Sequence, residues 1–203
     1  MESKISLTIL LFFIFLSGCI EFNNHNSNGF NDNFDFIQTH EHFYGKVVKV
    51  VDGDTVYVVA ENGTKYKIRL LGVDTPETHI KNNPYEYYID KNTPITDVNY
   101  LKKWGYKATE FAKNKLENKT VIVVFDNKAP KKDKYGRYLA YIFVSNTTYG
   151  IRKPEVFVNF NEELLKYGYA RVYISNFELK DEFIKIEKEA KMRRIGLWNW
   201  SNN

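Results

Sequence analysis

The folds open to this chain are limited most by residues 45–71, where three strand-like runs follow one another with only short breaks. The runs are Gly45–Val51, Thr55–Ala60 and Lys65–Leu71. The first two are rich in valine, and the third alternates apolar with basic side chains, which is typical of strands with one buried face. The dipeptides that separate the runs, Asp52-Gly53 and Asn62-Gly63, favour tight hairpin turns. The sequence therefore predicts an antiparallel meander of three strands.

A helix and two more strands are expected beyond the meander. The helix is indicated by five apolar residues at the spacing of one helical face: Trp104, Ala108, Phe111, Ala112 and Leu116. The strands are Thr120–Phe125 and Leu139–Val144. Residues 78–98 lie between the meander and the helix, and their polar, proline-containing sequence predicts a long loop or an insertion.

Two further helices are expected near the C-terminus. The first has Asn161 as its N-cap, two acidic residues in its first turn and Gly168 just past its end. The second places four apolar residues on one face: Leu179, Phe183, Ile186 and Ala190. Five short strands, with a helix between the third and the fourth, predict an α+β protein. Its expected architecture is a five-stranded Greek-key barrel of the OB type with three helices.

Residues 1–19 have the layout of a secretory signal peptide. The apolar run Ile5–Leu16 follows a short start containing Lys4, and it is shorter than the roughly 20 apolar residues of a spanning helix. Residues 16–18 directly before Cys19 resemble a prokaryotic lipobox, in which that cysteine is lipidated. We therefore expect an exported protein that is anchored in the membrane at the cell surface by a lipid on Cys19. The alternatives are a secreted protein with a plain signal peptide and a protein with an uncleaved hydrophobic anchor.

The remaining chain divides into a linker and one domain. Residues 20–43 are rich in asparagine, show no sustained period and are expected to be a flexible tether, whereas residues 44–203 are expected to form the folded domain. Hydrophobic residues make up 43% of the chain, which excludes a disordered protein, and the single cysteine excludes a disulfide framework or a thiolate zinc cluster. Residues 43–203 carry 28 basic against 20 acidic side chains, which suggests a polyanionic partner.

Three separated motifs contain the residues suited to catalysis: Asp52–Thr55, Arg69–Glu77 and Asp133–Arg137. The meander brings the first motif beside the end of the third strand, so that three carboxylates, those of Asp54, Asp74 and Glu77, can converge. Such carboxylates repel one another unless a cation neutralises them, and oxygen ligands without histidine or cysteine favour Ca²⁺. Each motif arginine, Arg69 and Arg137, presents a planar fork that suits a phosphate. This combination indicates phosphodiester cleavage.

Taken together, the motifs resemble those of the staphylococcal nuclease (thermonuclease) family over about Tyr44–Trp198. Gly168–Val172 and Gly196–Trp198 also match the family layout. The resemblance implies a calcium-dependent nuclease that acts on DNA and/or RNA and leaves 3′-phosphate and 5′-hydroxyl ends. It implies calcium ligands at Asp54, Asp74 and the carbonyl of Thr75. It further implies that Glu77 is the general base or positions the attacking water, and that Arg69 and Arg137 hold the phosphate.

The resemblance also implies substrate contacts outside the catalytic set. Lys134 and Tyr135 match family residues that contact the neighbouring phosphate. Tyr173 is a candidate for the base-stacking tyrosine, although the segment 172–175 is shorter than in the family and the stretch 78–98 is longer. We expect a monomer.

The main alternative is a non-catalytic OB module that binds single-stranded nucleic acid at the cell surface. The 33 aromatic residues and the basic domain suit such a module. A third class, a surface lipoprotein that binds sugars or scaffolds the envelope, would need neither motif arginine. Binding modules of this descent are expected to lose the acid and arginine set, which is complete here: Asp54, Arg69, Asp74, Glu77 and Arg137. An enzyme is therefore favoured.

Overall fold

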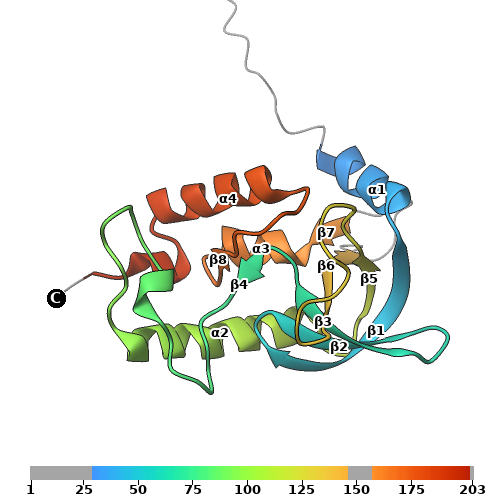
Figure 1. Ribbon diagram of the computed structural model, residues 1–203, viewed down its shortest axis with the longest axis horizontal. Helices are drawn as coiled ribbons and strands as arrows, with labels where there is room; N and C mark the ends of the chain where they lie inside the picture. Colours follow the sequence, from blue (N-terminus) through green and yellow to red (C-terminus); the bar gives the residue numbers. More distant parts are fainter. Residues whose placement is uncertain (1–28, 146–156, 202–203) are drawn as a thin grey trace, which may run out of the picture.

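Five strands close into a barrel in the computed structural model, which describes residues 29–145 and 157–201 (Figure 1). They are β1 (His42–Asp52), β2 (Thr55–Ala60), β3 (Lys65–Leu70), β5 (Thr120–Val124) and β6 (Tyr138–Ser145). The strands pair antiparallel in the order β3-β2-β1-β5-β6, and parallel pairing of β3 with β6 closes the sheet. The expected α+β class and five-stranded OB barrel are confirmed.

Three short strands extend this arrangement. β7 (Phe157–Asn159) pairs antiparallel with β6, and β4 (Val73–Asp74) pairs antiparallel with β8 (Arg171–Val172). The second pairing sets residue 74 opposite residue 171, although they are almost a hundred positions apart in the chain. It therefore joins the end of the meander to the segment that precedes the last helix.

Successive side chains along the strands of the meander point alternately into the barrel core and away from it. Val56 and Val58 of β2 and Ile68 and Leu70 of β3 are buried in the barrel core. The intervening residues of β3 point away from the core, as the period of two along a strand requires. Charged side chains on β3 therefore lie outside the barrel.

Helix α2 (Val98–Leu116) packs one face against the barrel and the segment before it. Asp97 caps its start by accepting hydrogen bonds from the backbone amides of Asn99 and Tyr100 at 2.9 and 3.0 Å. Its buried residues are Leu101, Gly105, Ala108, Ala112 and Leu116. Three of the five positions expected to face the core are thus fully buried, and the other two, Trp104 and Phe111, are half-buried.

Helix α3 (Phe160–Lys166) begins two residues earlier than expected, and its N-cap is Asn159 rather than Asn161. Asn161 is instead completely buried in the helix. Its side chain donates hydrogen bonds to the carbonyls of Leu71 and Ala140 at 2.9 and 3.3 Å, and it accepts one from the amide of Ile142 at 3.1 Å. Because an unpaired buried amide is costly, these bonds fix α3 against the closed seam of the barrel. Helix α4 (Lys180–Met192) then packs on α3.

The expected flexible tether is wrong for the part of it that the structure describes. Residues 29–39 form helix α1 (Gly29–Thr39), and β1 begins at His42. Ile37 is buried, Asn33 donates to the carbonyl of Phe157 at 2.9 Å, and His40 Nε2 lies 2.6 Å from Glu178 Oε2. The four contacting residues, Asn33, Phe36, Ile37 and His40, have helical spacing. Because two of them are polar, the hydrophobic pattern did not reveal the helix. The described residues thus contain four α-helices rather than three.

The expected signal peptide and lipidation site, residues 1–19 with Cys19, lie outside the described residues. Within residues 29–145 and 157–201, no helix has the length and hydrophobicity needed to cross a membrane.

The stretch 78–98, expected as a long loop, is anchored in a second hydrophobic cluster. A short 3₁₀ helix, η1 (Pro84–Glu86), precedes Tyr87, and Tyr87 and Ile95 are buried with Leu101 of α2 and Trp198 of η2 (Gly196–Asn199). Figure 1 shows this segment beside α2 at the end of the molecule away from the barrel. The insertion is therefore a packed part of the domain, and it forms one wall of the site described below.

Replacement of Ile37 by alanine should destabilise the domain, because it removes buried methyl groups between α1 and the barrel. A loss of about 2–4 kcal/mol in the free energy of unfolding is expected, measured by urea denaturation. Phe34→Ala is the matched control, since Phe34 is exposed on the same helix and should cost little. Equal effects of the two substitutions would show that α1 does not pack as described.

Candidate active site

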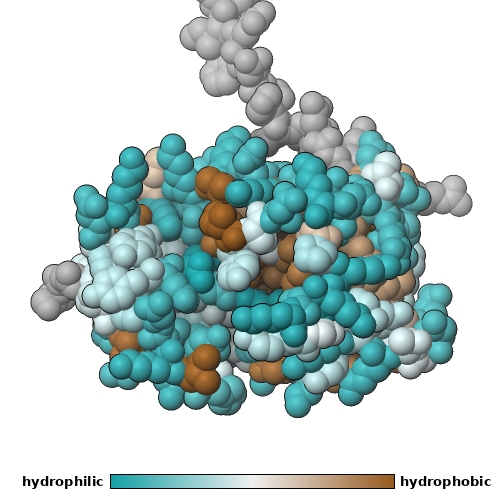
Figure 2. Space-filling view, viewed as in Figure 1, coloured by the Kyte–Doolittle hydropathy of each residue, from teal (hydrophilic) through white to brown (hydrophobic). Residues whose placement is uncertain are grey.

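A cleft of about 810 Å³ lies at the end of the meander and is lined by all three motifs. The turn between β1 and β2, the chain from Arg69 to Glu77 and the segment from Asp133 to Arg137 each contribute side chains. Parallel pairing of β3 with β6 sets Arg69 opposite Leu139, which brings the third motif to the second. Figure 2 shows a hollow in this face of the molecule, bordered mainly by hydrophilic residues.

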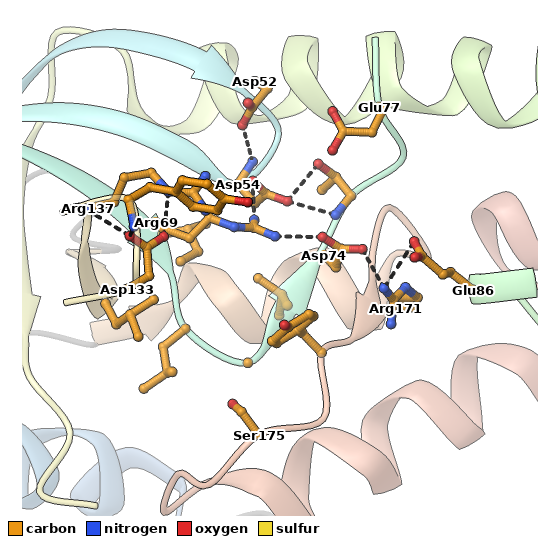
Figure 3. Close-up of a pocket in the computed structure, with 18 of the residues that line it drawn as sticks. Asp52, Asp54, Arg69, Asp74, Glu77, Glu86, Asp133, Arg137, Arg171 and Ser175 are labelled. Carbon is orange, nitrogen blue, oxygen red and sulfur yellow. Dashed lines mark hydrogen bonds and ion pairs between the residues drawn. The ribbon is translucent and has the colours of Figure 1, made fainter. Parts of the chain in front are cut away.

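The Arg69 guanidinium lies between two carboxylates at the centre of the cleft (Figure 3). Its Nη1 pairs with Asp54 Oδ1, and its Nη2 lies 2.6 Å from Asp74 Oδ1. All three side chains are largely buried, so the charges interact strongly and need one another's compensation. Asp54 and Asp74 are thus both directed at one cationic group.

The second oxygen of Asp54 is fixed by Thr75. Asp54 Oδ2 accepts hydrogen bonds from the amide and the hydroxyl of Thr75 at 2.8 and 3.0 Å. The neighbouring Asp52 accepts from the amide of Asp54 at 3.2 Å. Burial raises the pKa of Asp52, and the positive charge of Arg69 opposes that rise. These contacts lock the first motif onto the second.

Glu77 extends from a backbone that is held on two sides. Asn82 of the insertion accepts from the Glu77 amide at 2.7 Å and donates to its carbonyl at 2.9 Å. On the other side, a Cβ added to Gly105 of α2 would lie only 2.3 Å from the carbonyl oxygen of Pro76. The Glu77 carboxylate itself makes no hydrogen bond or ion pair with the described residues. Its pKa is raised by burial and by the charges of Asp74 and Asp52, which outweigh the two motif arginines.

Arg137 is oriented by Asp133 within the third motif. Arg137 Nε donates to Asp133 Oδ2 at 2.7 Å, while Asp133 Oδ1 accepts from the amides of Tyr135 and Arg137 at 2.9 and 3.0 Å. Burial opposes ionisation of Asp133, but these hydrogen bonds prevail and lower its pKa. The two terminal nitrogens of Arg137 make no hydrogen bond with the described residues, so they remain able to bind a ligand in the cleft.

The expected substrate-contacting residues lie at the rim of the cleft. Lys134, Tyr135 and Tyr173 all line it, and the two tyrosine side chains are mostly exposed. The ring of Tyr135 has Lys134 Nζ 5.0 Å and the Arg137 guanidinium carbon 5.5 Å from its centre. Two exposed aromatic rings therefore line the cleft together with its charged residues.

Sequence reasoning missed two residues that hold Asp74, Arg171 and Tyr87, and a third, Glu86, that pairs with Arg171. Arg171 Nη2 lies 2.8 Å from Asp74 Oδ2 and 3.4 Å from Glu86 Oε2, and the buried Tyr87 hydroxyl donates to Asp74 Oδ2 at 3.4 Å. Burial and the charge of Asp74 raise the pKa of Tyr87 well above its usual value, so it remains a neutral donor. Arg171 lies within the Gly168–Val172 segment that the sequence had singled out, although no role was assigned to it, and nothing in the sequence indicated Tyr87 or Glu86.

The acidic residues fit a hard divalent cation by their chemistry. Asp54 and Asp74 supply carboxylate oxygens that already converge on a single positive group, and Thr75 lies against Asp54. Calcium prefers such oxygen ligands. No cluster of three or more histidine, cysteine, aspartate or glutamate residues with metal-binding geometry is present in the part of the chain that the structure describes.

A closed OB barrel with a lateral cleft, in which two arginines lie among several carboxylates, is an arrangement suited to binding a phosphate group. Residues 67–200 match the family model described as Staphylococcal nuclease homologue. The chain belongs to the staphylococcal nuclease family, as its motifs had indicated.

Three relatives illustrate the breadth of this similarity. An uncharacterized protein of Methanocaldococcus jannaschii is 64% identical over 207 residues, which cover 98% of this chain and 96% of the relative. A thermonuclease of Staphylococcus hyicus is 31% identical over 156 residues, 76% of this chain and 75% of the relative. The endonuclease YncB of Bacillus subtilis is 33% identical over 156 residues, 75% of this chain and 60% of the relative.

The close approach of α2 to the Pro76–Glu77 backbone can be tested with Gly105→Ala. Helix propensity alone would favour alanine by about 1 kcal/mol, but the added methyl group must push the Pro76 carbonyl away. We expect net destabilisation of about 1–3 kcal/mol by denaturant unfolding and a lower catalytic rate, because Glu77 moves with the displaced backbone. A variant that is more stable than the wild type would contradict the contact.

Proposed function

We propose that the protein hydrolyses phosphodiester bonds of DNA and/or RNA with the help of Ca²⁺, and that it leaves 3′-phosphate and 5′-hydroxyl ends. The observation that carries this proposal is the position of Arg69 between Asp54 and Asp74, in the cleft that Glu77 and Arg137 also line. The family to which the chain belongs supports the reaction class.

Asp54, Asp74 and the main-chain carbonyl of Thr75 would hold the calcium ion. The convergence of both carboxylates on one cationic group supports this assignment. Bound calcium would supply positive charge that lowers the cost of bringing an anionic phosphate among carboxylates. Arg171 and Tyr87 hold the far oxygen of Asp74 and so keep its near oxygen directed into the cleft.

Arg69 and Arg137 bind the scissile phosphate and stabilise the negative charge that grows on it in the transition state. Arg137 suits this role because Asp133 occupies only its Nε, which leaves both terminal nitrogens for phosphate oxygens. A planar guanidinium can donate two parallel hydrogen bonds, which an ammonium group cannot do. Fixed donors of this kind need no reorganisation during the reaction.

Glu77 takes the proton from the water that attacks phosphorus, or positions that water. Its carboxylate makes no hydrogen bond or ion pair with the residues that the structure describes, and its raised pKa makes it a stronger base than an ordinary glutamate. As the water oxygen bonds to phosphorus, the bond to the 5′ oxygen breaks, and that oxygen takes a proton from solvent to leave as a hydroxyl. Lys134 and Tyr135 bind the neighbouring phosphate, while Tyr173 provides an exposed ring for a base.

The catalytic assignment predicts large losses from conservative changes. Arg137→Lys and Glu77→Gln should each lower kcat by about 10²–10³, since fixed donors and a positioned base act in the chemical step. Cleavage of plasmid DNA and of RNA should stop in EDTA and return with calcium. Polynucleotide kinase should label the new 5′ ends without prior phosphatase treatment, because those ends carry hydroxyls.

Arg193→Lys is the matched control, because Arg193 is exposed and does not line the cleft. Full activity in EDTA would eliminate the calcium role, and 5′ ends blocked by phosphate would eliminate the end chemistry. Nucleic-acid binding without cleavage under any condition would establish the alternative, a non-catalytic binding module.

We also propose that the protein is exported and held at the membrane through Cys19, from the signal-like sequence of residues 1–19. Cys19→Ser should release the protein from the membrane fraction, and metabolic labelling with a fatty acid should lose its signal. Membrane association that persists in the variant, with no lipid incorporated in either protein, would leave an uncleaved hydrophobic anchor instead.

A further inference from the structure

Four exposed lysines form two cross-strand rows on the outer face of the meander. Lys49, Tyr57 and Lys67 are direct partners across β1, β2 and β3, and Lys46, Val59 and Lys65 form the parallel row above them. Directly opposed residues share a face of a sheet. We call the four lysines the lysine grid: Lys46, Lys49, Lys65 and Lys67.

The lysine grid has no acidic partner within residues 29–145 and 157–201. None of its four ammonium groups pairs with a carboxylate among the described residues, whereas Lys131 lies 2.6 Å from Glu41 and Lys191 lies 3.2 Å from Glu187. Within the grid, the ammonium groups of Lys65 and Lys67 lie 4.6 and 5.9 Å from the centre of the Tyr57 ring. Four unpaired like charges on three neighbouring strands repel one another, so the grid is electrostatically complementary to a polyanion.

The grid leads directly into the cleft. The next row on this face of the same three strands is Asp52, Thr55 and Arg69. Lys65, Lys67 and Arg69 therefore follow one another along one face of β3. Two residues along a strand advance about 6.7 Å, which is comparable to the separation of successive phosphates in an extended single strand. Figure 1 shows the hairpin of β2 and β3 projecting from the barrel, which extends the surface that these residues occupy.

We propose that the lysine grid binds the phosphate backbone of single-stranded nucleic acid beyond the bond that is cut in the cleft. The shared face with Arg69 favours a nucleic-acid strand over an anionic membrane, because one continuous backbone can contact both. The proposal deepens the proposed function and rests on it only for the statement that the bound strand is the one cut. Tyr57 between the lysines offers a ring against which a base can stack.

Binding of fluorescent oligonucleotides in EDTA tests the proposal without cleavage. The full chain is compared with a variant in which the four grid lysines are changed to glutamine, using strands of about 6 and about 20 nucleotides. Each phosphate contact on a single strand contributes about 0.7 to the steepness of the plot of log binding constant against log salt concentration. Because the variant loses four such contacts, its plot for the longer strand should be less steep than that of the wild type by about 3. Raising salt from about 50 to about 200 mM should then weaken the wild type about 50-fold more than the variant.

The matched control changes four exposed lysines elsewhere to glutamine: Lys102 and Lys103 of α2, and Lys185 and Lys188 of α4. This control carries the same net charge as the grid variant and should keep the wild-type slope. Cleavage of the 6-nucleotide strand should stay within about twofold of wild type in both variants, since neither alters the cleft. If four substitutions unfold the protein, the pairs Lys46/Lys65 and Lys49/Lys67 should each remove about half of the slope difference.

Each outcome decides the proposal. An unchanged slope in the grid variant, or an equal fall in the control, would overturn it. If the grid variant binds oligonucleotides normally but no longer co-sediments with phosphatidylglycerol vesicles, the lysine grid faces a membrane. That result would also overturn the proposal. Grid-dependent binding by a wild-type protein that cuts nothing would support the grid while the proposed nuclease function fails.

Discussion

Parallel pairing of β3 with β6 closes the barrel, and the cleft depends on this closure. The pairing joins Ile68, Arg69 and Leu70 to Tyr138, Leu139 and Ala140, so it places the second motif directly beside the third. The buried side chain of Asn161 reinforces the seam by bonding to the backbone on both sides of it. A loss of this seam would separate Arg69 from Arg137 even if each local segment kept its conformation.

The buried carboxylates of the cleft also need positive charges or hydrogen-bond donors beside them. Asp54 and Asp74 are largely buried, and burial of unpaired carboxylates is unfavourable by several kcal/mol each. Arg69 and Arg171 satisfy Asp74 from two sides, and Thr75 satisfies Asp54 through its amide and hydroxyl. The groups that compensate these buried charges therefore also fix the directions of the oxygens that a cation would meet.

The insertion links this charge network to the rest of the domain. Tyr87 and Ile95 are buried with Leu101 and Trp198, which fixes the insertion against α2 and the C-terminal segment. From that position Tyr87 reaches Asp74, and Asn82 holds the backbone of Glu77. Although the segment is polar in sequence, the buried side chains of Tyr87 and Ile95 fix it in place. The segment then makes polar contacts in the site through Asn82 and Tyr87.

The sequence by itself determined the meander, helix α2 and the three motifs, because period, turn dipeptides and charge clusters are local properties of the chain. It also indicated which arginines and carboxylates line the cleft, since the motifs lie at strand ends that a barrel brings together. Only the tertiary structure decided the roles of α1, Asn161 and Tyr87. Helix α1 buries one face that is half polar, Asn161 bonds to strands far away in sequence, and Tyr87 reaches Asp74 from an insertion. These contacts join residues separated by 13 to more than a hundred positions, and no local pattern records which distant partner a side chain will meet.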